Sequence, residues 1–195
     1  DNFVLSGISD KITDYRVDIR DYKTINNIIK KEKPEIIFHL AAQPLVLESY
    51  KNPHYTIETN IQGTVNILEA FRNSKTAKGL IIITTDKVYQ NNEWVWSYRE
   101  NDRLGGKDPY SASKAAAELI ISSYQSSYFN NDNKSIVSVR AGNVIGGGDW
   151  SENRIVPDCI KALEKDKKIF VRDRKSTRLN SSHKPISYAV FCLKK

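Results

Sequence analysis

The sequence predicts an α/β fold built on a parallel sheet, and three observations support this. Apolar runs of strand length recur at residues 35–40, 80–83 and 135–140. Segments with a helical spacing of apolar residues, such as 56–72 and the stretch that begins at Pro109, separate these runs. No internal repeat interrupts the alternation, which is typical of a doubly wound parallel sheet because parallel strands need helical crossovers.

The first expected elements are a short strand at 16–19 and a helix at 22–33. Asp21 can cap this helix, and Ile25 lies on its apolar face. Pro34 ends the helix because proline cannot continue the backbone hydrogen bonds.

A central strand is expected at 35–40, since nearly every residue in it is apolar. Ala41 and Ala42 follow, and small side chains at the carboxyl end of a parallel strand leave room for a ligand near the backbone. His39 lies inside the apolar run, so we interpret it as a hydrogen-bonded core residue and not as a catalytic one.

The next strand and helix carry the candidate chemistry. The strand at 80–83 ends in the polar segment 84–87 (TTDK), and the following helix carries Tyr110 and Lys114. These two residues are four apart and therefore share one helical face. A phenol and an ammonium opposite a strand end with Thr and Asp favour proton and hydride transfer.

The charge on Lys114 can make Tyr110 a base. Free tyrosine has a pKa of about 10, so a base near neutral pH needs a pKa roughly three units lower, or about 4 kcal/mol. One ammonium at about 4 Å, in an effective dielectric of about 20, supplies energy of that order. The alternative is that Tyr110 and Lys114 form an ordinary surface pair on an alanine-rich helix. The position of this pair after the TTDK segment favours a catalytic role.

The C-terminal part is expected to contain a glycine-rich loop at 143–150, a helix at 155–166 and a strand at 168–172. The glycine run does not fit the Walker phosphate-binding pattern. A flexible turn is therefore the alternative to a ligand-binding loop.

Charge and composition exclude several classes of function. The chain of 195 residues has a net charge of +7, but residues 173–195 hold six Lys or Arg against one Asp. The remainder has no basic stripe with interleaved aromatic residues, so we predict no nucleic-acid binding. No apolar run could span a bilayer, and no secretory signal opens the chain. Cys159 and Cys192 lack metal-ligand spacing, so we expect no metal site. Two cysteines do not suggest a disulfide scaffold and fit a reducing compartment, so we expect a cytoplasmic location.

Several ordered motifs resemble one enzyme family. TDK at 85–87 with YSASK at 110–114 is similar to the extended short-chain dehydrogenase/reductases of the NAD-dependent epimerase/dehydratase type, which act on nucleotide sugars. The segments 92–100, 104–110 and 140–150 resemble, more narrowly, the CDP-glucose 4,6-dehydratases in it. The likeness covers about residues 14–172 and implies a Rossmann-like doubly wound sheet that binds NAD.

The resemblance also implies roles for particular residues. The catalytic candidates are Thr85, Asp86, Lys87, Tyr110 and Lys114. The cofactor contacts are expected at Asp18, Ile19, Leu40, Ala41 and Ala42, together with Tyr110 and Lys114; a plain turn role for Asp18 is an equally good interpretation. Asn143 and Arg154 become candidate ligands of the substrate phosphates. The implied reaction is a lyase reaction, the NAD-dependent dehydration of CDP-glucose to CDP-4-keto-6-deoxyglucose, in a homodimer.

The chain departs from the family at both ends. It lacks the Gly-x-x-Gly-x-x-Gly turn and first strand of a Rossmann domain, so we expect 1–172 to be a partial NAD-binding domain with part of the sugar-nucleotide site. Such a fragment would bind NAD poorly and be inactive by itself. Residues 173–195 show no helical or strand period and resemble translated sequencing-adapter read-through, so we expect a non-native tail; a divergent native tail is the alternative.

Two questions of function stay open at this level. The rivals to the dehydratase are another nucleotide-sugar epimerase or dehydratase, and a non-catalytic fragment unable to bind NAD. Lys87 stands where related dTDP-glucose dehydratases have glutamate. It is either a base of unusual type or a residue that pairs with Asp86 or orients the substrate.

Overall fold

The computed structural model describes residues 2–129, 133–151 and 153–169. The described residues form two compact units. The sheet unit lies within 17–142, and the terminal unit comprises 2–16 and 143–169. The expected boundary after residue 172 and the expected tail lie outside the described residues.

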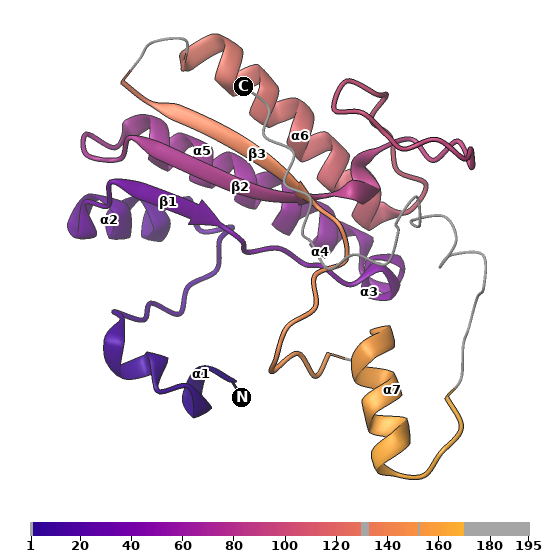
Figure 1. Ribbon diagram of the computed structural model, residues 1–195. Coiled ribbons are helices and arrows are strands. Elements are labelled where there is room, and N and C mark those ends of the chain that lie inside the picture. The colour runs from indigo at the N-terminus through magenta and orange to yellow at the C-terminus, as the bar shows by residue number, and fades with distance from the viewer. Residues whose placement is uncertain (1, 130–132, 152, 170–195) are drawn as a thin grey trace. The chain divides into compact units, whose positions relative to one another are not determined.

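A three-stranded parallel sheet forms the centre of the sheet unit (Figure 1). Its strands are β1 (Ile36–His39), β2 (Gly79–Thr85) and β3 (Ser135–Ala141), in the order β1-β2-β3. Thr85 pairs with Ala141, so β2 and β3 end at the same edge. The parallel α/β fold predicted from the sequence is therefore confirmed.

Along the chain, helices precede and separate the strands of this sheet. They are α2 (Tyr22–Glu32), α3 (Val46–Lys51), α4 (Pro53–Ile57), η2 (Glu58–Gln62), α5 (Gly63–Asn73), η3 (Asp86–Val88) and α6 (Pro109–Tyr128). Side chains from α2, α5 and α6 form one core with the sheet, including Ile25, Phe71, Leu80, Ile82 and Ile121. On the other face of β1, Ile36 and Phe38 are exposed.

Two side-chain caps fix where the key helices begin. Asp21 accepts a hydrogen bond from the backbone N–H of Thr24 at 3.2 Å, which confirms the predicted cap of α2. Asp108 accepts from the N–H of Ser111 at 2.9 Å, and Pro109 occupies the first turn of α6, where no N–H is needed. The helix that carries Tyr110 therefore starts at a defined residue.

The helix expected at 56–72 forms, but with an irregularity. It is built from α4, η2 and α5, and the middle piece, η2, is a π-helix. Such π-turns are rare and occur frequently at functional sites.

The strand expected at 16–19 is wrong. Residues 13–18 have no regular secondary structure, residues 19 and 20 form a turn, and no described segment pairs with them in a sheet. A strand requires a neighbour for its backbone hydrogen bonds, which an apolar pattern alone does not reveal. Residues 168 and 169 likewise form no strand, and the rest of the strand expected at 168–172 lies outside the described residues.

The terminal unit contains α1 (Asn2–Leu5), η1 (Ile8–Lys11) and α7 (Ile155–Glu164), the last of these close to the helix expected at 155–166. In the described part of the chain, no helix has both the length and the hydropathy that a bilayer crossing requires.

Candidate active site at the end of strand β2

Helix α6 places Tyr110 and Lys114 one turn apart, and both side chains are buried. The Nζ atom of Lys114 donates a hydrogen bond to the carbonyl of Ile83 on β2 at 3.0 Å. Helix α6 also packs against η3, which holds Asp86 and Lys87. The fold therefore brings the helix with Tyr110 and Lys114 to the strand end with the other three catalytic candidates.

Thr85 organises the turn after β2. Its hydroxyl donates to Oδ1 of Asp86 at 3.2 Å and accepts from the backbone N–H of Lys87 at 3.3 Å. A Cβ added at Gly142, directly after β3, would lie 3.9 Å from Oδ2 of Asp86. Asp86 is thus held between the ends of two adjacent strands, where parallel sheets place their ligands.

Burial controls the charge of two groups near this strand end. It lowers the pKa of Lys114 to about 8, while the charge of Glu118 acts in the opposite direction. Lys114 therefore remains mostly protonated at neutral pH. Burial and the nearby Lys114 lower the pKa of His39 to about 4. His39 Nε2 lies 3.2 Å from the hydroxyl of Thr64, which confirms that it is a hydrogen-bonded core residue.

The segment after β1 is exposed to solvent, and hydrogen bonds anchor the residue that follows it. Leu40 and Ala41 are exposed and Ala42 is half-buried. The next residue, Gln43, exchanges two backbone hydrogen bonds with the side chain of Asn60, at 2.8 and 3.1 Å. Residues 40–42, three of those predicted to contact the cofactor, therefore form a short, largely exposed segment with an anchored end.

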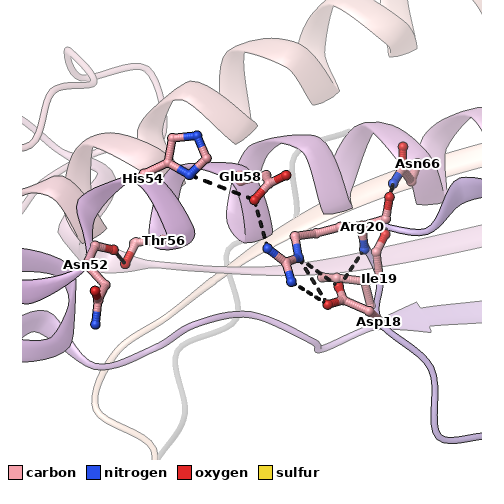
Figure 2. Close-up of polar contacts among 8 residues, drawn as sticks. All are labelled: Asp18, Ile19, Arg20, Asn52, His54, Thr56, Glu58 and Asn66. Atoms are coloured by element: carbon pink, nitrogen blue, oxygen red, sulfur yellow. Dashed lines mark hydrogen bonds and ion pairs between the residues drawn. The ribbon is translucent and has the colours of Figure 1, made fainter.

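Asp18 is bound by Arg20 in the turn before α2 (Figure 2). Both the backbone N–H and the guanidinium of Arg20 donate to the Asp18 carboxylate, at 2.7 to 3.1 Å. These hydrogen bonds lower the pKa of Asp18 to about 2. Arg20 also pairs with Glu58 at 2.8 Å, so the same side chain joins this turn to the π-helix η2.

The turn is attached to α5 as well. The side-chain amide of Asn66 donates to the carbonyls of Ile19 and Arg20, both at 2.9 Å (Figure 2). A Cβ added at Gly63 would lie only 2.5 Å from Cδ1 of Ile19, so this glycine allows the isoleucine to pack on the helix. A cofactor contact at Asp18 and Ile19 stays a prediction, on a turn that is well fixed.

Asn143 and Arg154 belong to the terminal unit and are described with it. Arg154 forms an ion pair with Asp149, with 3.4 Å between Nε and Oδ2. Their role in substrate binding stays a prediction. Among the described residues, no three His, Cys, Asp or Glu side chains are grouped so that they could hold a metal ion.

The sequence reasoning did not single out Glu118 and Arg140. These side chains form a buried ion pair between α6 and β3, with 3.1 Å between Oε1 and Nε. A signal existed in the sequence. Each is a charge in an otherwise apolar stretch, and Glu118 follows Lys114 at the same four-residue spacing that joins Lys114 to Tyr110.

Comparisons with known proteins identify the family of this chain. Residues 4–178 match the family described as GDP-mannose 4,6 dehydratase. The chain is 45% identical over 181 residues to CDP-glucose 4,6-dehydratase of Salmonella typhimurium, which covers 90% of this chain and 50% of that protein. It is 35% identical over 175 residues to dTDP-D-glucose 4,6-dehydratase of Dictyostelium discoideum, covering 84% and 39%. The chain thus spans half or less of the length of these relatives.

Solved structures show the same fold. The UDP-glucose 4-epimerase of Thermus thermophilus, solved in complex with NAD, has a TM-score of 0.64 and 30% identity, covering 74% of this chain and 47% of that one. The dTDP-glucose 4,6-dehydratase of Bacillus anthracis, also in complex with NAD, has a TM-score of 0.71 and 24% identity, covering 87% and 50%.

Proposed function

This chain belongs to the family of GDP-mannose 4,6 dehydratase, one of the short-chain-type nucleotide-sugar epimerases and dehydratases, and on this premise we propose that the whole protein dehydrates CDP-glucose to CDP-4-keto-6-deoxyglucose with NAD. The identity to the Salmonella typhimurium enzyme supports the choice of substrate. The observation that carries the proposal is the buried Tyr110–Lys114 pair, held at the end of β2 by the Lys114–Ile83 hydrogen bond.

The residues present fit part of a nicotinamide dinucleotide site. Leu40 and Ala41 are exposed at a strand end, where the small side chains of Ala41 and Ala42 leave room for a ligand. Asp18 is an exposed, ionised hydrogen-bond acceptor. The pyrophosphate-binding glycine turn is absent from these 195 residues. When bound, NAD supplies a hydride acceptor at the sugar C4 and the returning hydride at C6.

Tyr110 removes the proton of the 4-hydroxyl group in this proposal. The positive charge of Lys114 favours the tyrosinate, since opposite charges close together in a buried site stabilise each other. The hydroxyl of Thr85 hydrogen-bonds the same sugar oxygen and orients it. A positioned acid or base of this kind contributes about 10²–10⁴-fold to the rate.

Elimination of water requires an acid and a base. The 4-keto group acidifies the C5 proton, which a base removes as the bond from C6 to its hydroxyl breaks. Asp86 donates the proton that converts the departing hydroxyl into water. Lys87 is the candidate base at C5; the alternative is that it pairs with Asp86 or orients the sugar.

Exchange of Lys87 for glutamate separates these roles. If Lys87 is only a base, Lys87→Glu retains elimination, because glutamate can take the same proton. Loss of elimination with 4-oxidation intact points to a role that only lysine can perform. Deuterium uptake at C5 from heavy water measures the step directly.

We assign the remaining contacts in the same way. Asn143 and Arg154 bind the substrate phosphates, to which a guanidinium is well suited. A homodimer forms through α5 and α6, where Ala112 and Leu119 are exposed on a helix otherwise rich in small residues. An exposed apolar stripe of this kind is typical of helix packing between subunits.

A chimera tests the proposed function without assuming that 195 residues suffice. Residues 4–169 of this chain replace the matching segment of the Salmonella typhimurium relative, and the product is followed by NMR with CDP-glucose and NAD. The proposal expects a 4-keto-6-deoxy sugar. A C4 epimer would support the epimerase rival, and a folded chimera that binds NAD but converts nothing would support the non-catalytic one.

A further inference from the structure

The carboxylate of Glu118 is buried and fully hydrogen-bonded. Oε1 accepts from Nε of Arg140 at 3.1 Å and from the hydroxyl of Thr84. Oε2 accepts from a terminal guanidinium nitrogen of Arg140 and from the hydroxyl of Ser138, both at 3.2 Å. Helix α6 is therefore joined through one side chain to both β2 and β3.

Glu118 and Lys114 bind consecutive residues of β2. Lys114 donates to the carbonyl of Ile83, and Glu118 accepts from the hydroxyl of Thr84. The next residue along the strand is Thr85, the first of the catalytic candidates. Because Tyr110, Lys114 and Glu118 follow one another at four-residue intervals, they lie on one side of α6. The two contacts thus set the register between the helix and the strand end.

A purely structural contact would not require a charge at this position. Burying a carboxylate is costly even when it is paired, and well-packed apolar residues often replace a buried ion pair without loss of stability. Its partner Arg140 is bound on its other side by the hydroxyl of Tyr89 at 3.0 Å and the carbonyl of Glu100 at 2.8 Å. Because Arg140 is held on both sides, the negative charge of its partner Glu118 stays in place, one helical turn from Lys114.

We propose that Glu118 is a positioning residue for the reaction, which fixes α6 against the end of β2 and holds Lys114 in the cationic form that acts on Tyr110. The inference rests on the proposed function for its catalytic meaning. Glu118 does not touch the reacting atoms; it acts through Lys114.

Other charged groups near α6 also affect the protonation of Lys114. The elements packed against α6 carry several ionisable groups, namely Glu48, Tyr50 and Lys51 on α3, His54 and Tyr55 on α4, Glu58 on η2, Glu69 and Arg72 on α5, Asp86 and Lys87 on η3, and Arg140 on β3. Helix α6 itself adds Tyr110, Glu118, Tyr124 and Tyr128, and His39 on β1 interacts electrostatically with Lys114. His39 is neutral above a pH of about 4. Arg140 is neutralised locally by its pair with Glu118. Removal of the Glu118 charge therefore leaves Lys114 with less negative charge nearby.

The test is an NMR titration of Lys114 in this chain, without cofactor or substrate. Lysine is labelled at Cε, and the Lys114 signal is assigned by its loss in Lys114→Arg. In Glu118→Gln, the pKa of Lys114 should fall from about 8 to about 7 or lower. Glu118→Asp keeps the charge and should restore most of the original value. Glu32→Gln, an exposed carboxylate on α2, is the matched control and should leave it unchanged.

Glu118→Gln leaves Arg140 buried without its partner, so Glu118→Gln/Arg140→Met is titrated as well. The proposal expects a lowered Lys114 pKa in this variant too. An unchanged pKa of Lys114 in either folded variant contradicts the proposal.

In the chimera, Glu118→Gln should also move the alkaline limb of the rate profile to lower pH by the same amount. A lowered Lys114 pKa with an unmoved limb contradicts the link to catalysis, whereas failure of the proposed function appears separately, as a chimera without dehydratase activity.

Discussion

Asn60 and Ser113 form a hydrogen bond of 2.9 Å that joins the π-helix η2 to the helix carrying Tyr110 and Lys114. Ser113 in turn donates to the carbonyl of Tyr110 at 2.7 Å. Since Asn60 also holds the backbone of Gln43 after β1, a single buried amide connects the candidate cofactor segment to the candidate catalytic helix. The π-turn has a clear role here, because it belongs to the segment that presents this amide.

Asn60→Ala should lower the free energy of unfolding by about 2–4 kcal/mol. The change leaves Ser113 and both backbone groups of Gln43 with unmet hydrogen-bonding capacity in a buried site. Urea denaturation measures the effect. Asn73→Ala is the control, because the exposed side chain of Asn73 hydrogen-bonds only at the surface, to Tyr22 and Glu69, and the loss of these contacts should cost less than about 1 kcal/mol. Equal effects of the two changes would contradict the assignment.

Gly106→Ala should destabilise the loop before α6. A Cβ at Gly106 would lie 2.4 Å from the backbone N of Ala112, which the capped first turn of the helix cannot easily move aside. Overpacking of this kind costs about 1–3 kcal/mol. Gly105→Ala is the adjacent control, since its nearest atom would be 3.6 Å away, an ordinary contact. Thermal denaturation of both variants should show a clear loss only for Gly106→Ala.

His39 should make the protein less stable in mild acid. Its pKa is lowered to about 4 in the folded chain, whereas an unfolded histidine titrates near 6.5. The unfolded state therefore binds the extra proton first, and stability falls as the pH drops from about 6.5 towards 4, by about 2 kcal/mol at pH 5. His39→Gln should remove most of this contribution.

His54→Gln provides the control for that measurement. The His54 side chain is 93% exposed, and its replacement should leave the acid dependence unchanged. Urea unfolding of both variants at pH 7 and pH 5 gives the comparison. If the free energy of unfolding falls equally in wild type and His39→Gln between pH 7 and pH 5, other groups cause the acid sensitivity.

Lys114 should affect stability in an alkaline pH range, with the same sign as His39. Its folded pKa of about 8 lies below the value of 10.5 for a free lysine, so the folded state releases its proton first. Stability should therefore rise with pH from about 8 upward, by as much as about 1.4 kcal/mol per pH unit. Lys114→Met should remove this rise between pH 7 and 9.

The same variant should also be more stable at pH 7. Removal of the buried charge should raise the free energy of unfolding by about 1–3 kcal/mol, less the cost of leaving the Ile83 carbonyl without its donor. Such a gain would mark Lys114 as a functional residue kept at the expense of stability. A loss of stability at pH 7 would show that the hydrogen bond to Ile83 outweighs the burial of the charge.

The sequence predicted the strands and helices that hold the candidate chemistry because their periodicity is strong and local. The sequence predicted Asp21 as the cap of one helix and Pro109 as the start of another, and the strand that ends in Thr85 has a continuous apolar run from Leu80 to Ile83. The wrong strand at 16–19 has a different cause. Its conformation depends on a distant partner and not on its own side chains.

The connecting hydrogen bonds were also beyond sequence reasoning. The Asn60–Ser113 contact spans 53 residues, and the Glu118–Arg140 pair spans 22. Helical spacing identifies Tyr110 and Lys114 as neighbours, but it cannot tell which strand residue will meet Glu118. The register of helix on strand, which decides this, follows from packing across the whole unit.

Tyr110→Phe in the chimera is the decisive test of Tyr110 as the catalytic base. The chimera and its variant are incubated in heavy water with CDP-glucose and NAD, and the formation of 4-keto sugar and deuterium at C5 are followed by NMR. We predict conversion by the chimera and a loss of at least about 10²-fold in Tyr110→Phe. Tyr98→Phe, in the aromatic loop before α6, should retain most activity. Conversion at an undiminished rate in Tyr110→Phe would contradict the assignment of Tyr110 as the catalytic base.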